Sequence, residues 1–312
     1  MKRGVFINQI RANCSIYESG LMIYDVLKES KEYSIDYIET DFRLNQFKRM
    51  AKQPYDFHIV NWHPYTLAIG QNEIIGLRNR IAIVLEVGPN EYTPVTPAFF
   101  DAYAIIDPTK GRRDTCFPLP RPVLPAPGKP LLDNKKLVLG SFGLFSQQFS
   151  HEKKFEEIVD QANKSGRESI VRINLPIPNY TSTPLPVIRK YGDWLKSLAK
   201  SNVEVIVTHK YMTRNELVGW LSEHTMNCFP YYRDRAGLSA VTDQAVAAGR
   251  AVMTTECNTF RHVHKYISHY PKQSYPELAE STLAGVKQMQ QDWSPANFRL
   301  HFDNMLVEMR MI

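Results

Sequence analysis

The stretch AGLSAVTDQAVAAGRAV, residues 236–252, decides how the second half of the chain is interpreted. A turn of small residues is followed by an Ala-rich helical run, then by Gly249 and an apolar run typical of a strand. Such a turn directly before a helix serves either close packing or the approach of an anion to exposed backbone N–H groups. The spacing alone leaves both interpretations open.

Short runs of β-branched residues alternate with helical patterns on both sides of this stretch. The strands predicted from these runs are 4–10, 33–40, 56–62, 81–87, 102–108, 136–142, 168–174, 203–208, 225–229 and 251–255. The predicted helices are 16–30, 65–80, 151–164, 185–200, 213–223, 239–248, 275–291 and a last one that begins with Ser294 as its N-cap. This alternation predicts an α/β protein with parallel sheets.

A change in composition divides the chain. Residues 116–134 carry six prolines, which stiffen an extended chain and interrupt sheet pairing. We therefore predict an N-terminal Rossmann-like domain over residues 1–120, a linker over 121–134, a second Rossmann-like domain over 135–294, and a terminal helix over 295–312 that packs back on the first domain. Two such domains are expected to face each other across a cleft, with ligands outside the carboxyl ends of the strands.

Composition restricts the class of protein. The net charge of +6 permits an anionic partner but does not require one, because no Lys/Arg tract is present. No apolar run approaches the roughly 18 residues that a membrane-spanning helix needs, and the first residues resemble a strand more than a signal peptide. The four cysteines are far apart in the sequence, which argues against zinc or a disulfide framework and favours the cytoplasm.

The turn within the opening stretch offers a phosphate site. Gly237, Leu238 and Ser239 precede the helix with their N–H groups expected to be open, and the Ser239 hydroxyl is a candidate cap or extra donor. Gly249 is expected to end the helix.

The longer order of elements over residues 202–255 resembles the donor-binding half of GT-B glycosyltransferases, and glycosyltransferase family 4 in particular. The segment SFGLFSQQFSHEKKFEEIVDQANK, residues 141–164, is similar to the first strand, loop and helix of that half. YDFHIVNWH, residues 55–63, resembles a late strand of the family's N-terminal domain.

The resemblance assigns roles to particular positions. It implies that Lys153, with Lys154 as the rival, meets the donor diphosphate. The family's Glu-x7-Glu pair falls on Ala236 and Gln244, of which Gln244 keeps the ability to hydrogen-bond a donor hydroxyl.

Neighbouring residues are candidates for what this chain lacks. Asp234 or Asp243 can substitute for the first Glu, and Arg233 or Arg235 for the family's paired Arg. The loop HKYMT, residues 209–213, approaches the base in this fold, so that Lys210 and Tyr211 are candidate donor contacts.

The implied reaction transfers a sugar from a nucleotide diphosphate sugar, UDP- or GDP-linked, and needs no further cofactor. Helix N-terminal amides and Lys or Arg stabilise the leaving diphosphate. The D-x-D motif of the other large glycosyltransferase fold is absent, so we expect metal-independent transfer.

The acceptor side is expected in the N-terminal domain. His63 and Glu86 each follow a predicted buried strand and are candidates for acid/base catalysis. Glu86 is the sharper candidate, because a Glu within the apolar run IVLEVG is expected to be buried and buried Glu is rare without a partner. Asn8, Arg11 and Asn13 follow the first strand and are candidate contacts to acceptor or phosphate.

Several alternatives remain open. The missing Glu pair favours a catalytically inactive GT-B-like partner subunit. The basic net charge is compatible with a glycosyltransferase acting on DNA, but no aromatic-interleaved basic stripe supports this, so a saccharide or lipid-linked acceptor is preferred. No G-x-G-x-x-G follows a strand, which argues against nicotinamide enzymes. His262 and His264 do not share a helix face, which argues against a metal site there.

Overall fold

The computed structural model describes residues 1–10, 14–40, 53–63, 74, 76–87, 99–124, 126–144, 153–177, 183–233 and 237–312. The chain divides into two compact units, which are described separately. Unit 1 comprises Met1–Pro122, Ala236–Leu238 and Asp292–Ile312, and unit 2 comprises Val123–Arg235 and Ser239–Gln291.

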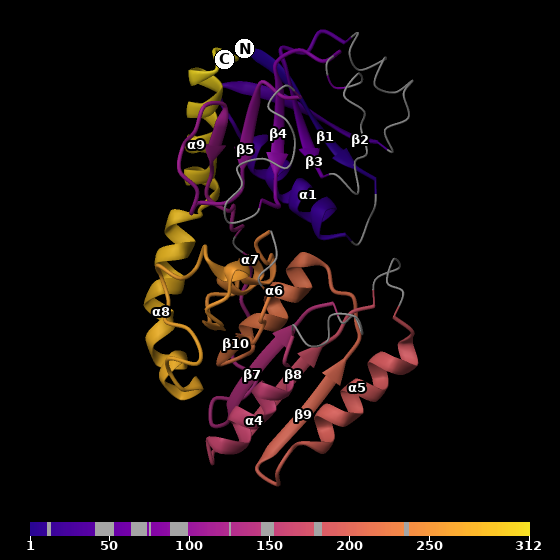
Figure 1. The fold of residues 1–312 in the computed structure, drawn as a ribbon, viewed down its shortest axis with the longest axis vertical. Coiled ribbons are helices and arrows are strands. Elements are labelled where there is room, and N and C mark those ends of the chain that lie inside the picture. The colour runs from indigo at the N-terminus through magenta and orange to yellow at the C-terminus, as the bar shows by residue number, and fades with distance from the viewer. Residues whose placement is uncertain are drawn as a thin grey trace. The chain divides into compact units, whose positions relative to one another are not determined.

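Unit 1 is built on a six-stranded parallel sheet with the order β2-β1-β3-β4-β5-β6 (Figure 1). Its strands are β1 (Lys2–Gln9), β2 (Tyr33–Thr40), β3 (Phe57–Trp62), β4 (Arg80–Val84), β5 (Ala102–Ile105) and β6 (Cys116–Pro118). Every residue of β3 is buried, as expected for a parallel strand that is covered on both faces.

Alternate side chains of these strands form one continuous apolar layer. Val5 and Ile7 of β1 pack in one cluster with Val60 and Trp62 of β3, because residues two apart in a strand share a face. Helix α1 (Ser15–Leu27) packs against β1, and the last helix, α9 (Pro295–Glu308), packs against α1.

Helix α9 begins as the sequence predicts. The Ser294 side chain accepts a hydrogen bond from the backbone N–H of Asn297, and Pro295 occupies the first turn. The Tyr33 hydroxyl donates to the Asp303 carboxylate at 2.7 Å, which ties α9 to the start of β2.

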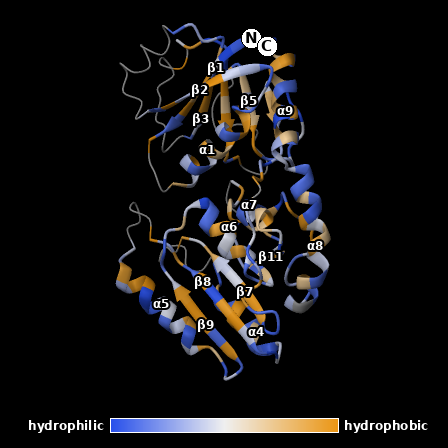
Figure 2. Cartoon of the chain, turned by 180° about the vertical axis from the view of Figure 1, so that it is seen from behind, coloured by the Kyte–Doolittle hydropathy of each residue, from blue (hydrophilic) through white to orange (hydrophobic). Residues whose placement is uncertain are grey.

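Unit 2 is built on a five-stranded parallel sheet with the order β11-β10-β7-β8-β9. Its strands are β7 (Leu137–Phe142), β8 (Ser169–Asn174), β9 (Val203–Thr208), β10 (Met226–Phe229) and β11 (Ala251–Thr254). Its helices are α4 (Glu156–Lys164), α5 (Leu185–Ser197), α6 (Arg214–Ser222), α7 (Val241–Ala247), the 3₁₀ turn η2 (Asn258–Phe260) and α8 (Tyr275–Asp292). Figure 2 shows hydrophobic residues along strands β8 and β9, interrupted by hydrophilic ones, and helices of mixed polarity.

The predicted fold class is confirmed: the protein is α/β with two parallel sheets, and the predicted strands lie within a few residues of the observed ones. Two predictions are corrected. The helix predicted over 65–80 does not reach Arg80, which starts β4, since residues 76–79 form a turn and bends; most of that segment lies outside the described residues. The short strand β6 lies in the proline-rich segment and pairs with β5, although no strand was predicted there because prolines interrupt sheet pairing.

The chain between Val123 and β7 belongs to unit 2. The backbone N–H of Lys129 donates to the Ser222 hydroxyl at 2.6 Å, and that of Leu132 donates to the Glu223 carbonyl at 2.8 Å. These bonds hold the proline-rich segment in an ordered conformation against the end of α6 in unit 2. No helix in the described part of the chain is both long and apolar enough to cross a membrane.

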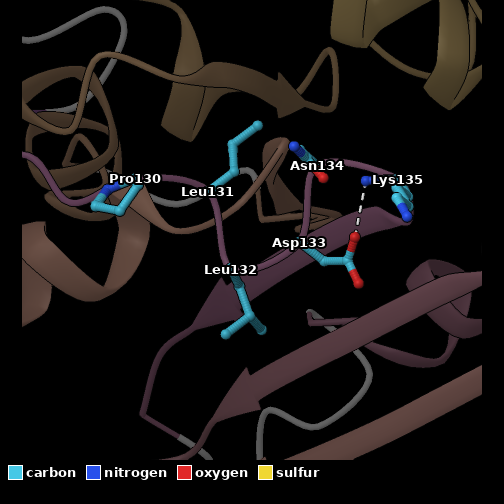
Figure 3. Close-up of a pocket in the computed structure, with 6 residues that line it drawn as sticks. All are labelled: Pro130, Leu131, Leu132, Asp133, Asn134 and Lys135. Atoms are coloured by element: carbon cyan, nitrogen blue, oxygen red, sulfur yellow. Dashed lines mark hydrogen bonds between the residues drawn. The ribbon is translucent and has the colours of Figure 1, made fainter.

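A hollow of about 640 Å³ lies on this segment and is lined by Pro130, Leu131, Leu132, Asp133, Asn134 and Lys135 (Figure 3). The Asp133 carboxylate accepts the backbone N–H of Lys135 at 2.7 Å, and Leu131 and Leu132 point in opposite directions. The hollow precedes β7 and so lies at the amino end of that strand, away from the edge at which open parallel sheets bind ligands.

Candidate functional site

The strand order of unit 2 reverses between β7 and β10. The chain runs from β7 through β8 to the edge strand β9, and then returns to the other side of β7 at β10. Ligands of open parallel sheets bind outside the carboxyl ends of the strands at such a point. The residues that follow Phe142 and Phe229, the last residues of β7 and β10, therefore line the expected site.

Lys153 lies at this point of the sheet. Its backbone forms a bridge with Tyr231, and its ammonium group donates to the Leu144 carbonyl oxygen at 2.7 Å. The ammonium nitrogen also lies 4.9 Å from the centre of the Tyr231 ring, a distance at which a cation is attracted to an aromatic face. Gly143 permits this arrangement, because a Cβ there would collide with the Tyr231 hydroxyl and lie 3.3 Å from the Lys153 ammonium.

The Tyr231 ring is a fixed, neutral support for that ammonium group. Its hydroxyl donates to the Phe142 carbonyl oxygen at 2.8 Å, and burial raises the pKa of the phenol. Tyr231 was not among the residues predicted for the site. Its signal was the run FPYY directly after a buried strand, which places an aromatic ring at the carboxyl edge of the sheet.

Lys154, the rival of Lys153, has different partners. Its ammonium nitrogen lies 4.7 Å from the centre of the Tyr232 ring and 3.9 Å from the Glu157 carboxylate. The Tyr232 hydroxyl donates to the same carboxylate at 2.9 Å. Lys154 therefore has a carboxylate counter-ion, Glu157.

Two of the three backbone N–H groups of the expected phosphate cradle have partners within the protein. The N–H of Gly237 donates to the Val87 carbonyl at 3.2 Å within unit 1, and the N–H of Ser239 donates to the Thr259 carbonyl at 3.1 Å within unit 2. These two amides are not open, because protein carbonyls take the place predicted for an anion. Ser239 is also not the helix cap: α7 begins after Ala240 without a side-chain cap.

Glycine is nevertheless the residue that this turn favours. Gly237 has φ +91°, a conformation that disfavours a side chain. A Cβ there would lie 3.1 Å from Cγ and 3.2 Å from the carboxyl carbon of Glu86. Close packing is therefore the interpretation that the structure favours, and the group that approaches the turn is Glu86.

Helix α7 ends as expected, since Gly249 has φ +67° and follows its last turn. Gln244 lies on this helix, and its side-chain oxygen is buried with no hydrogen-bond partner among the described residues. A buried amide oxygen without a partner costs free energy of desolvation. It is therefore an atom that a ligand hydroxyl would satisfy. Asp243, on the same helix, is buried.

Lys210 and Tyr211 follow the edge strand β9, which β8 separates from β7. The Lys210 ammonium donates to the Glu216 carboxylate at 2.8 Å. This pair, together with bonds from the Thr213 backbone and hydroxyl, lowers the Glu216 pKa to about 2. Tyr211 is exposed. The structure therefore brings Lys153 and Tyr231 together but leaves Lys210 in an ion pair at the edge of the sheet.

Unit 1 brings the two predicted acid/base residues together. His63 follows β3 and Glu86 follows β4, and the distance between Nε2 of His63 and a carboxylate oxygen of Glu86 is 3.3 Å. One premise was wrong: Glu86 is not buried, since 44% of its side chain is exposed, whereas His63 is 10% exposed. Strand β4 ends at Val84, which places Glu86 beyond the buried part of the strand.

The strand order of unit 1 reverses between β1 and β3. Here the Asn61 amide donates to the Asn8 side-chain oxygen at 2.8 Å and to the Ile16 carbonyl at 2.8 Å. Asn8 is fully buried, so its predicted role as an acceptor contact is corrected: it joins β1, β3 and α1. Arg11 and Asn13, the other two candidates, lie outside the described residues.

Asp234, Arg235 and Ala236 also lie outside the described residues. The histidines near the C-terminal part of unit 2 have structural partners: Nε2 of His262 lies 2.8 Å from the Thr242 hydroxyl, and the rings of His264 and His269 lie 4.9 Å apart. Among the described residues, no group of three or more His, Cys, Asp or Glu side chains is arranged to hold a metal ion.

Comparisons with known proteins give a fold. No protein-family model matches the sequence, and no curated protein matches it in a sequence search. Solved structures do resemble it.

The lipopolysaccharide outer-core galactosyltransferase WaaB has a TM-score of 0.56 at 10% identity, over 99% of both chains. Sucrose-phosphate synthase from Thermosynechococcus elongatus has 0.63 at 11% identity, also over 99% of both chains. The UDP-forming α,α-trehalose-phosphate synthase from Burkholderia xenovorans, solved with glucose-6-phosphate, has 0.61 at 9% identity, over 99% of this chain and 100% of that one.

At this level of identity the likeness concerns architecture. The narrower resemblance to family 4 stays a prediction. Two Rossmann-like units with parallel sheets of six and five strands, matched over nearly the whole chain, give the protein the GT-B fold.

Proposed function

We propose that this protein is a glycosyltransferase that moves a sugar from a nucleotide diphosphate sugar to a hydroxyl of a saccharide or lipid-linked acceptor, without a metal ion. The observation that carries the proposal is the Lys153 ammonium group at the β7/β10 reversal point of unit 2, held by the Leu144 carbonyl and the Tyr231 ring. A leaving diphosphate accumulates negative charge there, and a positioned cation stabilises it.

The donor site would use few side chains. Lys153 would bind the diphosphate, and the unpartnered oxygen of Gln244 would accept a hydrogen bond from a donor hydroxyl. Lys210 and Tyr211 remain proposed contacts to the nucleotide, and Arg235 remains a proposed source of further positive charge. Gly237 and Ser239 would act by holding the turn, since their N–H groups are bonded to protein carbonyls.

The acceptor chemistry would use the pair in unit 1. The glycosyl–phosphate bond breaks, the acceptor oxygen bonds to the anomeric carbon, and the hydroxyl proton is taken by a base. Glu86 is the exposed member of the pair and would take that proton, while the buried His63 would orient its carboxylate across the 3.3 Å contact.

The test is nucleotide binding measured by calorimetry and thermal shift with UDP, GDP, ADP, CMP and dTDP, with and without EDTA. A ligand at 100 times its dissociation constant stabilises a protein by about 2.7 kcal/mol. Replacing Lys153 by Met removes a charged hydrogen bond worth about 1.5–3 kcal/mol, so binding should weaken about 10- to 100-fold.

Lys154→Met is the matched control, because Lys154 is adjacent and is paired with Glu157. We expect it to bind nucleotide nearly as tightly as the unmodified protein does. Equal affinity of the Lys153→Met variant, or no binding of any nucleotide by the folded protein, would refute the donor site.

A second candidate function is a nucleotide-binding partner subunit without turnover. The internal bonds of Gly237 and Ser239 favour it, because they remove two amides that were expected to stabilise a leaving group. Binding of a nucleotide without release of nucleoside diphosphate from any sugar nucleotide would support this candidate over the enzyme.

A further inference from the structure

A cluster of side chains outside the pairs described above lies at the carboxyl ends of β1 and β2. Asn8 and Glu39 are register partners there. The Tyr17 hydroxyl donates to one Glu39 carboxylate oxygen at 2.7 Å, and the Tyr37 hydroxyl donates to the same oxygen at 3.0 Å. Glu39 is exposed, and both tyrosines are partly buried.

The buried Asn8 side chain and an aromatic contact hold the cluster in place. The buried Asn8 amide donates to the Tyr37 hydroxyl at 3.1 Å and to the Tyr17 carbonyl at 3.1 Å. The Tyr37 ring lies 4.6 Å from the Tyr24 ring, centre to centre. Two phenols on one carboxylate oxygen hold the carboxylate in one orientation, so its second oxygen is presented without the usual freedom of a Glu side chain.

Among the residues that the structure describes, the charges that act on the Tyr17 hydroxyl are those of Glu39 and Glu18, and both are negative. The hydrogen bond that Tyr17 donates to Glu39, burial, and the charges of Glu39 and Glu18 raise the Tyr17 pKa to about 12. The phenol therefore stays a donor at neutral pH. An ionised carboxylate accepts hydrogen bonds and does not donate them, so this position suits a ligand rich in hydroxyl groups and repels phosphate.

The cluster shares an edge of the sheet with the proposed acid/base pair. Strand β2 is two places from β3, the strand that precedes His63. Neighbouring strands are about 4.8 Å apart, so the two positions are separated by roughly 10 Å along the edge. That is more than one sugar ring covers, and a saccharide of two or more units would reach both.

We propose that Glu39, Tyr17 and Tyr37 form a subsite for a second, uncharged glycosyl unit of the acceptor, so that the acceptor is a neutral oligosaccharide chain and not a sugar phosphate. This inference rests on the proposed function, because the acceptor is defined by that reaction. It separates the protein from the structural neighbour that was solved with glucose-6-phosphate.

The experiment is binding of the full chain to an array of neutral di- to tetrasaccharides printed beside hexose 6-phosphates. We expect binding to neutral oligosaccharides, weakened about tenfold or more by Glu39→Gln, since a charged hydrogen bond is worth about 1.5–3 kcal/mol. Tyr17→Phe removes only the orienting hydroxyl and should weaken binding about three- to tenfold. Glu29→Gln changes an exposed carboxylate beyond α1 and should have no effect.

Three results would overturn the subsite. The first is preference for the hexose phosphates, and the second is absence of binding to every neutral oligosaccharide by the folded protein. The third is that the Glu39→Gln and Tyr17→Phe variants bind neutral oligosaccharides as tightly as the unmodified protein does. Nucleotide binding measured on the same samples separates the two proposals. Glycan binding that depends on Glu39 without any nucleotide binding supports the subsite and refutes the glycosyltransferase. Nucleotide binding together with glycan binding that does not depend on Glu39 supports the glycosyltransferase and refutes the subsite.

Discussion

Replacing Gly237 by Ala tests the link between the opening turn and the proposed base. The alanine methyl would lie 3.1–3.3 Å from Cγ, the carboxyl carbon and one oxygen of Glu86. Ordinary carbon contacts are about 3.5–4.0 Å. Because Glu86 is 44% exposed, its side chain can move away, and the contact with His63, already 3.3 Å long, would be lost.

The effect on stability should be small. Holding a non-glycine residue at φ +91° costs about 1–2 kcal/mol, and the reduced entropy of the unfolded chain returns about 0.4–1 kcal/mol. The net loss of about 1 kcal/mol should lower the Tm by about 2–4 °C for a unit of this size. The folded variant therefore remains available for measurement of activity.

The effect on transfer should be larger than the effect on stability. General acid–base catalysis contributes about 10²–10⁴-fold, so we expect displacement of Glu86 to reduce single-turnover transfer by about tenfold or more. Gly166→Ala is the matched control: Gly166 has φ +66° but no atom within 4 Å of its Cβ position. It should lower the Tm in the same way and leave transfer unchanged.

A double variant completes the test. In a Glu86→Gln background the Gly237→Ala change should have almost no further effect on transfer, because the group that it displaces is already inactive. Full transfer by the folded Gly237→Ala variant would refute the reasoning. So would a fall in transfer on adding Gly237→Ala to the Glu86→Gln variant that is as large as in the unmodified protein.

Three further predictions concern unit 2. Gly140→Ala should cost more than about 3 kcal/mol in urea unfolding, because its methyl would collide with the fully buried His224 ring, which is held by Asn227 at 2.8 Å. Burial lowers the His224 pKa to about 4, so only the unfolded chain takes up this proton between about pH 6.5 and 4. The free energy of unfolding should therefore fall on acidification across this window, by about 3 kcal/mol at most. A His224→Gln variant should lose this pH dependence. The Glu216 carboxyl should titrate near pH 2 by NMR, so that its stabilising contribution is complete above its ordinary pKa and lost as the pH falls through 2. Lys210→Met should raise that midpoint, since Lys210 is the largest cause of the shift.

The secondary structure could be predicted because it depends on local pattern. Strands such as residues 203–208 were predicted with the bounds observed for β9, and Ser294 with Pro295 marked the start of α9. Strand β6 was missed because its three residues, which end at Pro118, carry too little periodicity, and because its pairing with β5 depends on tertiary context.

The site was harder to predict because its contacts join distant residues. Sequence spacing showed that Gly237 and Ser239 precede a helix, but not that carbonyls of Val87 and Thr259 would take their N–H groups. Position in a run suggested that Glu86 is buried, whereas the strand ends two residues earlier. The Lys153–Tyr231 contact spans two separate strand ends, so sequence order alone gave no measure of it.

The charges at the two sheet edges give the proposals a common physical basis. At the carboxyl edge of unit 2, Lys153 and Lys154 present ammonium groups on tyrosine rings. At the carboxyl edge of unit 1, the exposed carboxylate of Glu39 lies near the end of β2, and that of Glu86 follows β4. In the proposed reaction, a diphosphate would be attracted to the first edge and repelled by the carboxylates of the second, whereas a neutral saccharide would meet hydrogen-bond acceptors there without a charge penalty. In that reaction, these charges would direct each substrate to a different unit, the diphosphate to unit 2 and the neutral saccharide to unit 1.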